Sequence, residues 1–177
     1  ASGMLFHGSP ARAAPSETKT YELFFDVSAL DLAYHADWPQ IEGVEAVVYA
    51  GNWGARSRQA TGRVFASSLD QIDVDVISIG GTVDRVRVGA RLQGPADDGI
   101  RFINDTPVAN LTSRVTETWF GSGSIAAHAE VVVPLARQAL RQTLADVTVS
   151  LKGNELVMPN YQLDAHNLTT ELTYSNE

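Results

Sequence analysis

Histidines and carboxylates are the side chains of this sequence that are best suited to acid–base or metal chemistry. The four histidines are His7, His35, His128 and His166, and none has the spacing of a zinc or metalloprotease motif. His128 and Glu130 are two residues apart in an expected strand, so both point to one face and could form an acid–base pair or half of a metal site. A metal site needs further ligands, which the sequence does not identify. We therefore expect a structural role for this pair, and neither a metal ion nor a cofactor.

A second group of polar and aromatic residues surrounds His35, at the expected end of a strand. Asp31, Asp37 and Trp38 lie close to it in the chain, and ligand-binding loops often occupy such positions. Asp residues followed by Pro39 are equally typical of a simple turn. The sequence leaves open whether His35 or the His128/Glu130 pair has a chemical role.

Motifs of nucleophilic and phosphate chemistry are absent from the sequence. No Gly-x-Ser-x-Gly elbow is present, and neither Lys19 nor Lys152 lies in a phosphate-binding loop. We predict no catalytic residues and favour a protein that is not an enzyme.

The segment 51–59 combines Trp53 with Arg56 and Arg58 between flexible glycines. Trp and Arg are enriched at the energetic centres of protein interfaces, and Arg also pairs with carboxylates. Stacking on a sugar is an alternative, and so is a Trp folded over the core with solvated arginines. We predict that Trp53, Arg56 and Arg58 contact a partner.

Alternating apolar residues predict that strands position these groups. Tyr21, Leu23, Phe25 and Val27 share one face, and a bulge near Ser28–Ala29 is needed to keep the following leucines on it. Further strands are expected at 44–50, 61–66, 72–79, 82–92, 100–103, 110–120, 124–133, 147–152, 155–164 and 168–174.

One segment has helical spacing instead. After Pro134, apolar residues recur every three to four positions, which predicts an amphipathic helix over residues 134–146. Because no regular helices separate the strands, we expect an all-β fold, an antiparallel β-sandwich or barrel with one helix.

Two hairpins can be examined by their register. Valines of 72–79 and 82–92 face each other, and Asp73 and Asp75 lie beside Arg85 and Arg87, if the connection through Gly80–Gly81 has three residues. A second, two-residue hairpin is expected at Gly153–Asn154.

The N-terminal residues 1–20 resemble an extended arm, because they combine glycine, proline and alanine with almost no periodicity. The remaining residues, 21–177, are expected to form a single β domain. The arm contains few apolar groups to offset the entropy of ordering it, so we predict that Leu5 and Phe6 anchor it on another subunit.

Composition limits the partners. The 177 residues contain 13 Lys and Arg against 21 Asp and Glu, a net charge of −8, which argues against nucleic acid as the main partner. No apolar stretch is long enough for a membrane-spanning helix, so no membrane insertion is expected. Cysteine is absent, and the sequence leaves the localisation unknown.

Three functions follow from these observations. The first is a non-enzymatic structural subunit that assembles with copies of itself into a shell, tube or fibre, as virion, phage-tail or pilus components do. The second is a β-barrel that binds a small molecule, such as a cyclase or isomerase. The third is a carbohydrate-binding sandwich that uses Trp53 or Trp119.

Overall fold

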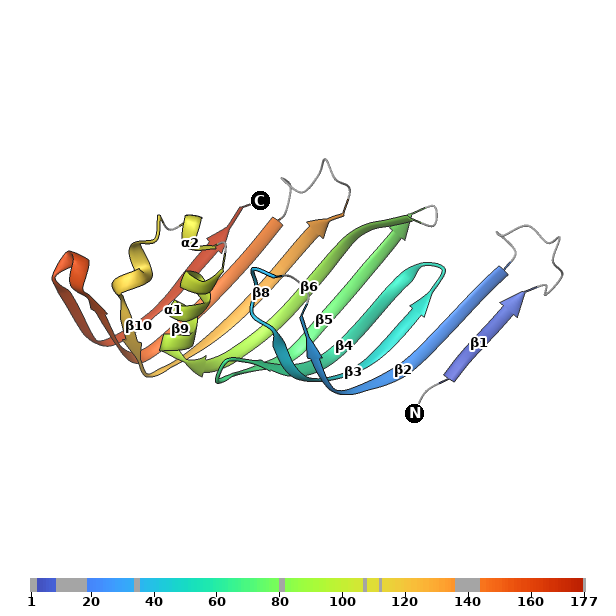
Figure 1. Ribbon diagram of the computed structural model, residues 1–177, viewed down its shortest axis with the longest axis horizontal. Helices are drawn as coiled ribbons and strands as arrows, with labels where there is room; N and C mark the ends of the chain where they lie inside the picture. The colour runs from blue at the N-terminus through green and yellow to red at the C-terminus, as the bar shows by residue number, and fades with distance from the viewer. Residues whose placement is uncertain are drawn as a thin grey trace.

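The computed structural model describes residues 3–8, 19–33, 36–79, 82–106, 108–111, 113–135 and 144–176. Within these residues the strands form one antiparallel sheet of ten strands (Figure 1). The strands follow one another in the order β1-β2-β3-β4-β5-β6-β8-β9-β10, and the short β7 pairs with β9. Their bounds are β1 Gly3–Gly8, β2 Lys19–Leu32, β3 Ile41–Gly51, β4 Gly54–Val64, β5 Ser67–Ile79, β6 Thr82–Pro95, β7 Phe120–Ser122, β8 Ser124–Pro134, β9 Leu144–Met158 and β10 Leu163–Ser175.

The short helices of the described residues lie between β6 and β10 in the chain. They are α1 (Ala96–Asp105), α2 (Val108–Leu111), and the 3-10 turns η2 (Val115–Thr118) and η4 (Pro159–Tyr161). None of the helices in the described ranges is long and apolar enough to cross a membrane.

The prediction of an all-β, antiparallel fold with a helix nearby is confirmed, and the sheet is not closed into a barrel. Among the described residues, the longest helix is α1, with 10 residues. It includes residues 100–103, where a strand was expected. Asp97 and Asp98 stand in its first turn, where acidic side chains interact favourably with the helix dipole. Of the expected helix at 134–146, Pro134 belongs to β8 and Leu144–Asp146 to β9, while 136–143 lie outside the described residues.

The two faces of the sheet differ in chemistry. Cross-strand neighbours on one side form a row of uncharged residues that runs from β2 to β9: Phe25, Val48, Ser57, Val74, Val88, Val131 and Ala145. We call this side the apolar face. The opposite side, the polar face, holds charged pairs such as Arg56 opposite Asp75 and Asp75 opposite Arg87.

A band of β-bulges crosses β2, β3, β4 and β5. Register shifts occur where Ala29, Gly43, Gln59 and Gln71 adopt positive φ angles of 52° to 60°. Bulges bend strands, and the strands curve in Figure 1. The bulge predicted near Ser28–Ala29 is therefore confirmed.

Carboxylates from neighbouring strands complete three of these bulges. The amide of Ala29 donates to Oε1 of Glu45 (3.0 Å), and that of Gly43 to Oδ1 of Asp31 (3.0 Å). The amide of Gln59 donates to Oδ1 of Asp73 (2.9 Å). An amide that a bulge removes from the ladder thus regains an acceptor from the adjacent strand.

The buried core lies beside the bulges, on the apolar face. Ala60, Val64, Leu69 and Ile72 form it, and Phe102 of α1 packs against them. Asp98 fixes the helix there, because its Oδ2 accepts from the amide of Ala66 (3.0 Å) and from the hydroxyl of Ser67 (2.7 Å). The core therefore lies where β4 ends and β5 begins, and both strands continue beyond it.

The register of the first hairpin agrees with the prediction in part. Val74 and Val76 face Val88 and Val86, and Asp75 faces Arg87, as expected. However, Asp73 faces Gly89, and Ile77 faces Arg85. Ile79 pairs with Thr82, so only two residues, 80 and 81, connect the strands. These two lie outside the described residues. A register shift between Ile77 and Ser78 therefore aligns the valines, in place of a three-residue loop.

The prediction of a hairpin at Gly153–Asn154 is wrong. Residues 144–158 form one continuous strand, β9, in which Gly153 has a φ of +68° and Asn154 is 1% exposed. The Asn154 side chain accepts from the amide of Lys152 (2.7 Å) and donates to the carbonyls of Ser122 (3.1 Å) and Ser124 (3.0 Å). These bonds join β9 to the β7–β8 connection.

Candidate functional site

The apolar face is a broad and chemically uniform surface of the described residues. Its central row crosses six strand-to-strand steps, or about 29 Å at roughly 4.8 Å for each step. A second row beside it, also uncharged, contains Leu23, Ala50, Ala55, Val76 and Val86. Alternation within each strand produces both rows, since every second side chain points to the same side.

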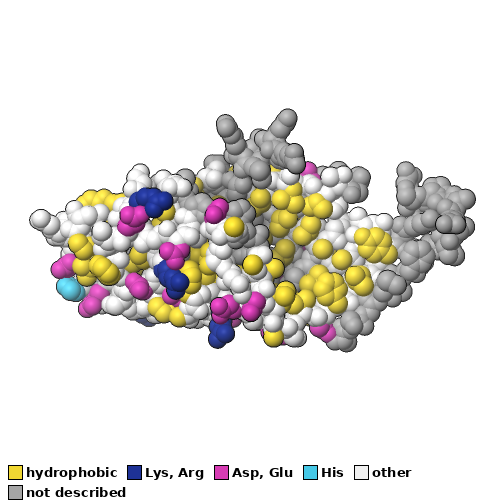
Figure 2. Space-filling view, in the orientation of Figure 1, with side chains coloured by type: hydrophobic (Ala, Val, Ile, Leu, Met, Phe, Trp, Pro, Cys, Tyr) yellow, Lys and Arg dark blue, Asp and Glu magenta, His cyan; other side chains and the backbone are white. Residues whose placement is uncertain are grey.

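Much of the apolar face is only half-covered. Val76, Val86, Val131 and Val147 are of intermediate burial, although equivalent residues between two stacked layers are fully buried. Figure 1 shows α1 over one end of the sheet, and Figure 2 shows hydrophobic side chains gathered over the middle of this face. At the β10 edge, Leu172 is 56% exposed. The described helices thus leave a broad apolar surface accessible.

Small and β-branched residues dominate this surface. Valine and alanine supply most positions of the two rows, and Ser57 supplies the polar one. The hydroxyl of Ser57 is buried without a hydrogen-bond partner in the described part of the chain. The surface therefore offers dispersion contacts and almost no directional bonds.

On the polar face, an ion pair engages Glu130, one of the two candidate acid–base residues. Glu130 Oε2 accepts from Arg87 at 2.7 Å, and this hydrogen bond and charge raise the pKa of Arg87. His128 lies opposite Arg91 and Thr148 on the same face. Glu130 thus has Arg87 as its partner. Among the described residues, no cluster of three or more His, Asp or Glu side chains could hold a metal ion.

The Trp53 turn lies at the end of the β3–β4 hairpin and faces a shallow hollow. Trp53 is 42% exposed and lies outside the buried core. Its indole packs against the Arg56 guanidinium, whose carbon lies 5.2 Å from the ring centroid. Arg58 forms an ion pair with Asp75 at 2.5 Å. The two arginines that were predicted to contact a partner together therefore differ, because Arg56 lies against aromatic rings and Arg58 against a carboxylate.

The other predicted residues are placed as follows. Leu5 and Phe6 belong to β1, opposite Glu22 and Tyr21 of β2, so this part of the predicted arm is a strand of the same sheet. Their contact with another subunit stays a prediction. His35 lies outside the described residues.

Sequence reasoning missed two features of these surfaces. Trp38, assigned to the polar group around His35, instead packs on Phe102 of α1 with ring centroids 5.6 Å apart. Tyr49 and Phe24, whose centroids lie 6.4 Å apart on the polar face, join the surroundings of Trp53. Phe24 and Tyr49 occupy positions that alternation assigns to the polar face, where aromatic residues are unexpected. This mismatch is the signal in the sequence that could have indicated the hollow.

Comparison with known proteins identifies the family. The profile of the family described as YhdP protein matches residues 2–177, so the chain belongs to this family. No curated protein and no solved structure matches.

Proposed function

We propose that this member of the YhdP family binds acyl chains of lipids along the apolar face of its sheet. The observation that supports the proposal is the uncharged row from Phe25 to Ala145, which is continuous across the sheet and flanked by half-covered valines. Exposed apolar patches of this extent mark interaction sites.

The dimensions suit a hydrocarbon chain. A bilayer's hydrocarbon core, about 30 Å thick, is two acyl chains deep, so one chain is about 15 Å long. The central row, at about 29 Å, accommodates that length. Each buried methylene contributes about 0.8 kcal/mol, so even partial contact along one chain gives substantial affinity.

The composition favours a ligand without polar groups. Protein interfaces concentrate aromatic residues, methionine and arginine at their centres. The rows of the apolar face consist mainly of valine and alanine instead. Such a surface matches a flexible saturated chain, which requires contact area and no hydrogen bonds.

Neighbouring valines on opposite faces provide the test. Val131 lies on the apolar face, and Val132 lies opposite Arg87 and Leu144 on the polar face; both are of intermediate burial. A phospholipid with a photoreactive group in its acyl chain is crosslinked to the full chain and to the Val131→Glu and Val132→Glu variants. We expect Val131→Glu to lose most of the crosslinking and Val132→Glu to retain it, with circular dichroism verifying that both fold.

Mapping the crosslinked residues of the unmodified chain by mass spectrometry gives a second readout that needs no substitution. Lipid attached at Val76 or Val86 agrees with the proposal. Attachment mainly at Asp75 or Arg85, or equal losses in the two glutamate variants, contradicts it.

Assembly with copies of itself is a second candidate, favoured by the edge strand β10. This strand of 13 residues has a described neighbour on one side only, β9, and its Leu172 and Tyr174 are 56% and 53% exposed. Such edges add strands from other chains. Sedimentation analysis of the Leu172→Lys variant tests this function, because lysine at an edge opposes pairing. Self-association that is unchanged in the variant contradicts it.

A further inference from the structure

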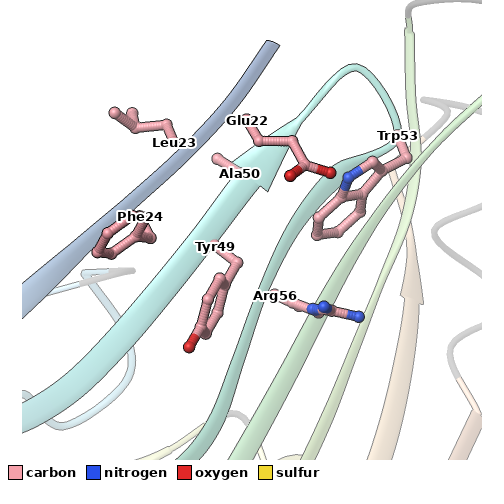
Figure 3. A pocket seen from close by; sticks show the side chains of 7 residues that line it. All are labelled: Glu22, Leu23, Phe24, Tyr49, Ala50, Trp53 and Arg56. Carbon is pink, nitrogen blue, oxygen red and sulfur yellow. The ribbon is translucent and has the colours of Figure 1, made fainter. Parts of the chain in front are cut away.

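A separate hollow on the polar face combines three exposed aromatic rings with one arginine. It has a volume of about 480 Å³, and the polar-face residues that line it are Glu22, Phe24, Tyr49 and Arg56, with Trp53 of the adjoining turn (Figure 3). Leu23 and Ala50, which belong to the second row of the apolar face, also border it. We call it the Trp53 hollow. Phe24, Tyr49 and Trp53 are 39%, 43% and 42% exposed, on a face that elsewhere holds ion pairs.

Two rings hold the Arg56 side chain in place. Its guanidinium carbon lies 5.6 Å from the centroid of Tyr49 and 5.2 Å from that of Trp53. Asp75, its neighbour by register, pairs with Arg58 instead. No carboxylate or carbonyl of the described residues accepts a hydrogen bond from Arg56, so within this part of the chain its planar donors are held in place and have no acceptor.

Glu22 shares the hollow without neutralising this arginine. In Figure 3 the indole of Trp53 lies between the Glu22 carboxylate and the Arg56 guanidinium. An arriving anion therefore meets a favourable charge at Arg56 and an unfavourable one at Glu22.

We propose that the Trp53 hollow docks a partner protein, which inserts a carboxylate beside Arg56 and an apolar side chain against Phe24 and Trp53. Tryptophan, tyrosine and arginine are the residues most enriched at interface hot spots, and here Arg56 lies against both Tyr49 and Trp53. The guanidinium fork matches carboxylate geometry, and its aromatic support reduces the entropy lost when an anion binds. This site lies on the opposite side of the sheet from the apolar face, and so it does not depend on lipid binding.

Two capped tripeptides test the charge requirement. The probes are acetyl-Leu-Glu-Leu-amide and its uncharged counterpart acetyl-Leu-Gln-Leu-amide, titrated into the ¹⁵N-labelled full chain. The readout is the indole N–H signal of Trp53, assigned with a Trp53→Phe variant. We expect the glutamate peptide to bind about two- to fivefold more tightly, the factor that an exposed ion pair provides.

Three variants locate that preference. Arg56→Gln should abolish it, whereas Glu22→Gln should increase it by removing the repulsive charge. Arg91→Gln, at an exposed position of the same face on β6, should leave it unchanged. A Trp53 signal unmoved by either peptide, or a preference for glutamate that survives Arg56→Gln, overturns the proposal.

Discussion

Replacement of Asn154 by alanine should strongly destabilise the fold, because this side chain satisfies three backbone groups in a place that water does not reach. Asn154 is 1% exposed and bonds the amide of Lys152 and the carbonyls of Ser122 and Ser124. A hydrogen bond contributes about 1 kcal/mol net, and a buried group left unpaired costs about 1–3 kcal/mol. We therefore expect Asn154→Ala to lower the free energy of unfolding by about 3 kcal/mol or more.

Asn160 offers a matched control. Its side chain accepts from Nε1 of Trp119 (3.0 Å) and donates to the carbonyl of Val115 (3.1 Å), yet Asn160 is exposed and water can replace both bonds. Asn160→Ala should cost about 1 kcal/mol or less. Urea unfolding followed by circular dichroism measures both variants. If their free energies of unfolding differ by less than about 0.5 kcal/mol, the assignment of Asn154 as a buried junction is incorrect.

Three further predictions concern stability and are measured by thermal unfolding. A methyl group at Gly94 would collide with the side chain of Ser67 and lie 2.7 Å from its Cα, so Gly94→Ala should lower the free energy of unfolding by about 2 kcal/mol. A methyl group at Gly89, in the same strand, meets no atom within 4 Å, so Gly89→Ala should be nearly neutral. Equal effects of the two substitutions contradict this prediction. Ser57→Ala removes a buried hydroxyl without a partner among the described residues and should stabilise by about 1 kcal/mol; a loss of stability would reveal an acceptor. Trp53→Ala, at a side chain 42% exposed, should cost about 1 kcal/mol, and a loss of roughly 3–5 kcal/mol would assign Trp53 to the core.

Local patterns in the sequence predict the parts of the fold that depend on neighbouring strands. Alternation of valine with Asp and Arg places Asp75 opposite Arg87, because any other parity buries charge. The shift in phase after Val27 likewise predicts the bulge at Ala29. In both cases the deciding information lies within the strands themselves.

Features decided by distant contacts could not be predicted in this way. Gly153–Asn154 is a typical turn sequence, but the same positive φ serves a bulge, and the carbonyls that bind Asn154 are 30 and 32 residues away. The segment around Ile100 fits a strand or a helix by its apolar residues, and it is helical where α1 docks against Ile125.

The candidate site shows the same division. Alternation predicts that each strand has one apolar side, and the sequence places Trp53 and Arg56 close together. It does not reveal what covers that apolar side, because coverage depends on where the helices pack. Alternation alone therefore predicts a sandwich or a barrel. It does not predict a single sheet whose core lies where β4 ends and β5 begins.

The carboxylate-completed bulges make the curvature of the sheet a property of strand pairs. Glu45 and Asp31 act between β2 and β3, and Asp73 acts between β4 and β5, so each bend is specified by two adjacent strands. A sheet built in this way can gain or lose a hairpin while the curvature of the other strands stays the same, just as a solenoid can gain or lose a repeat. Duplication of a hairpin would lengthen the apolar face without redesign of its profile, and evolution could adjust how far the surface extends independently of what it binds.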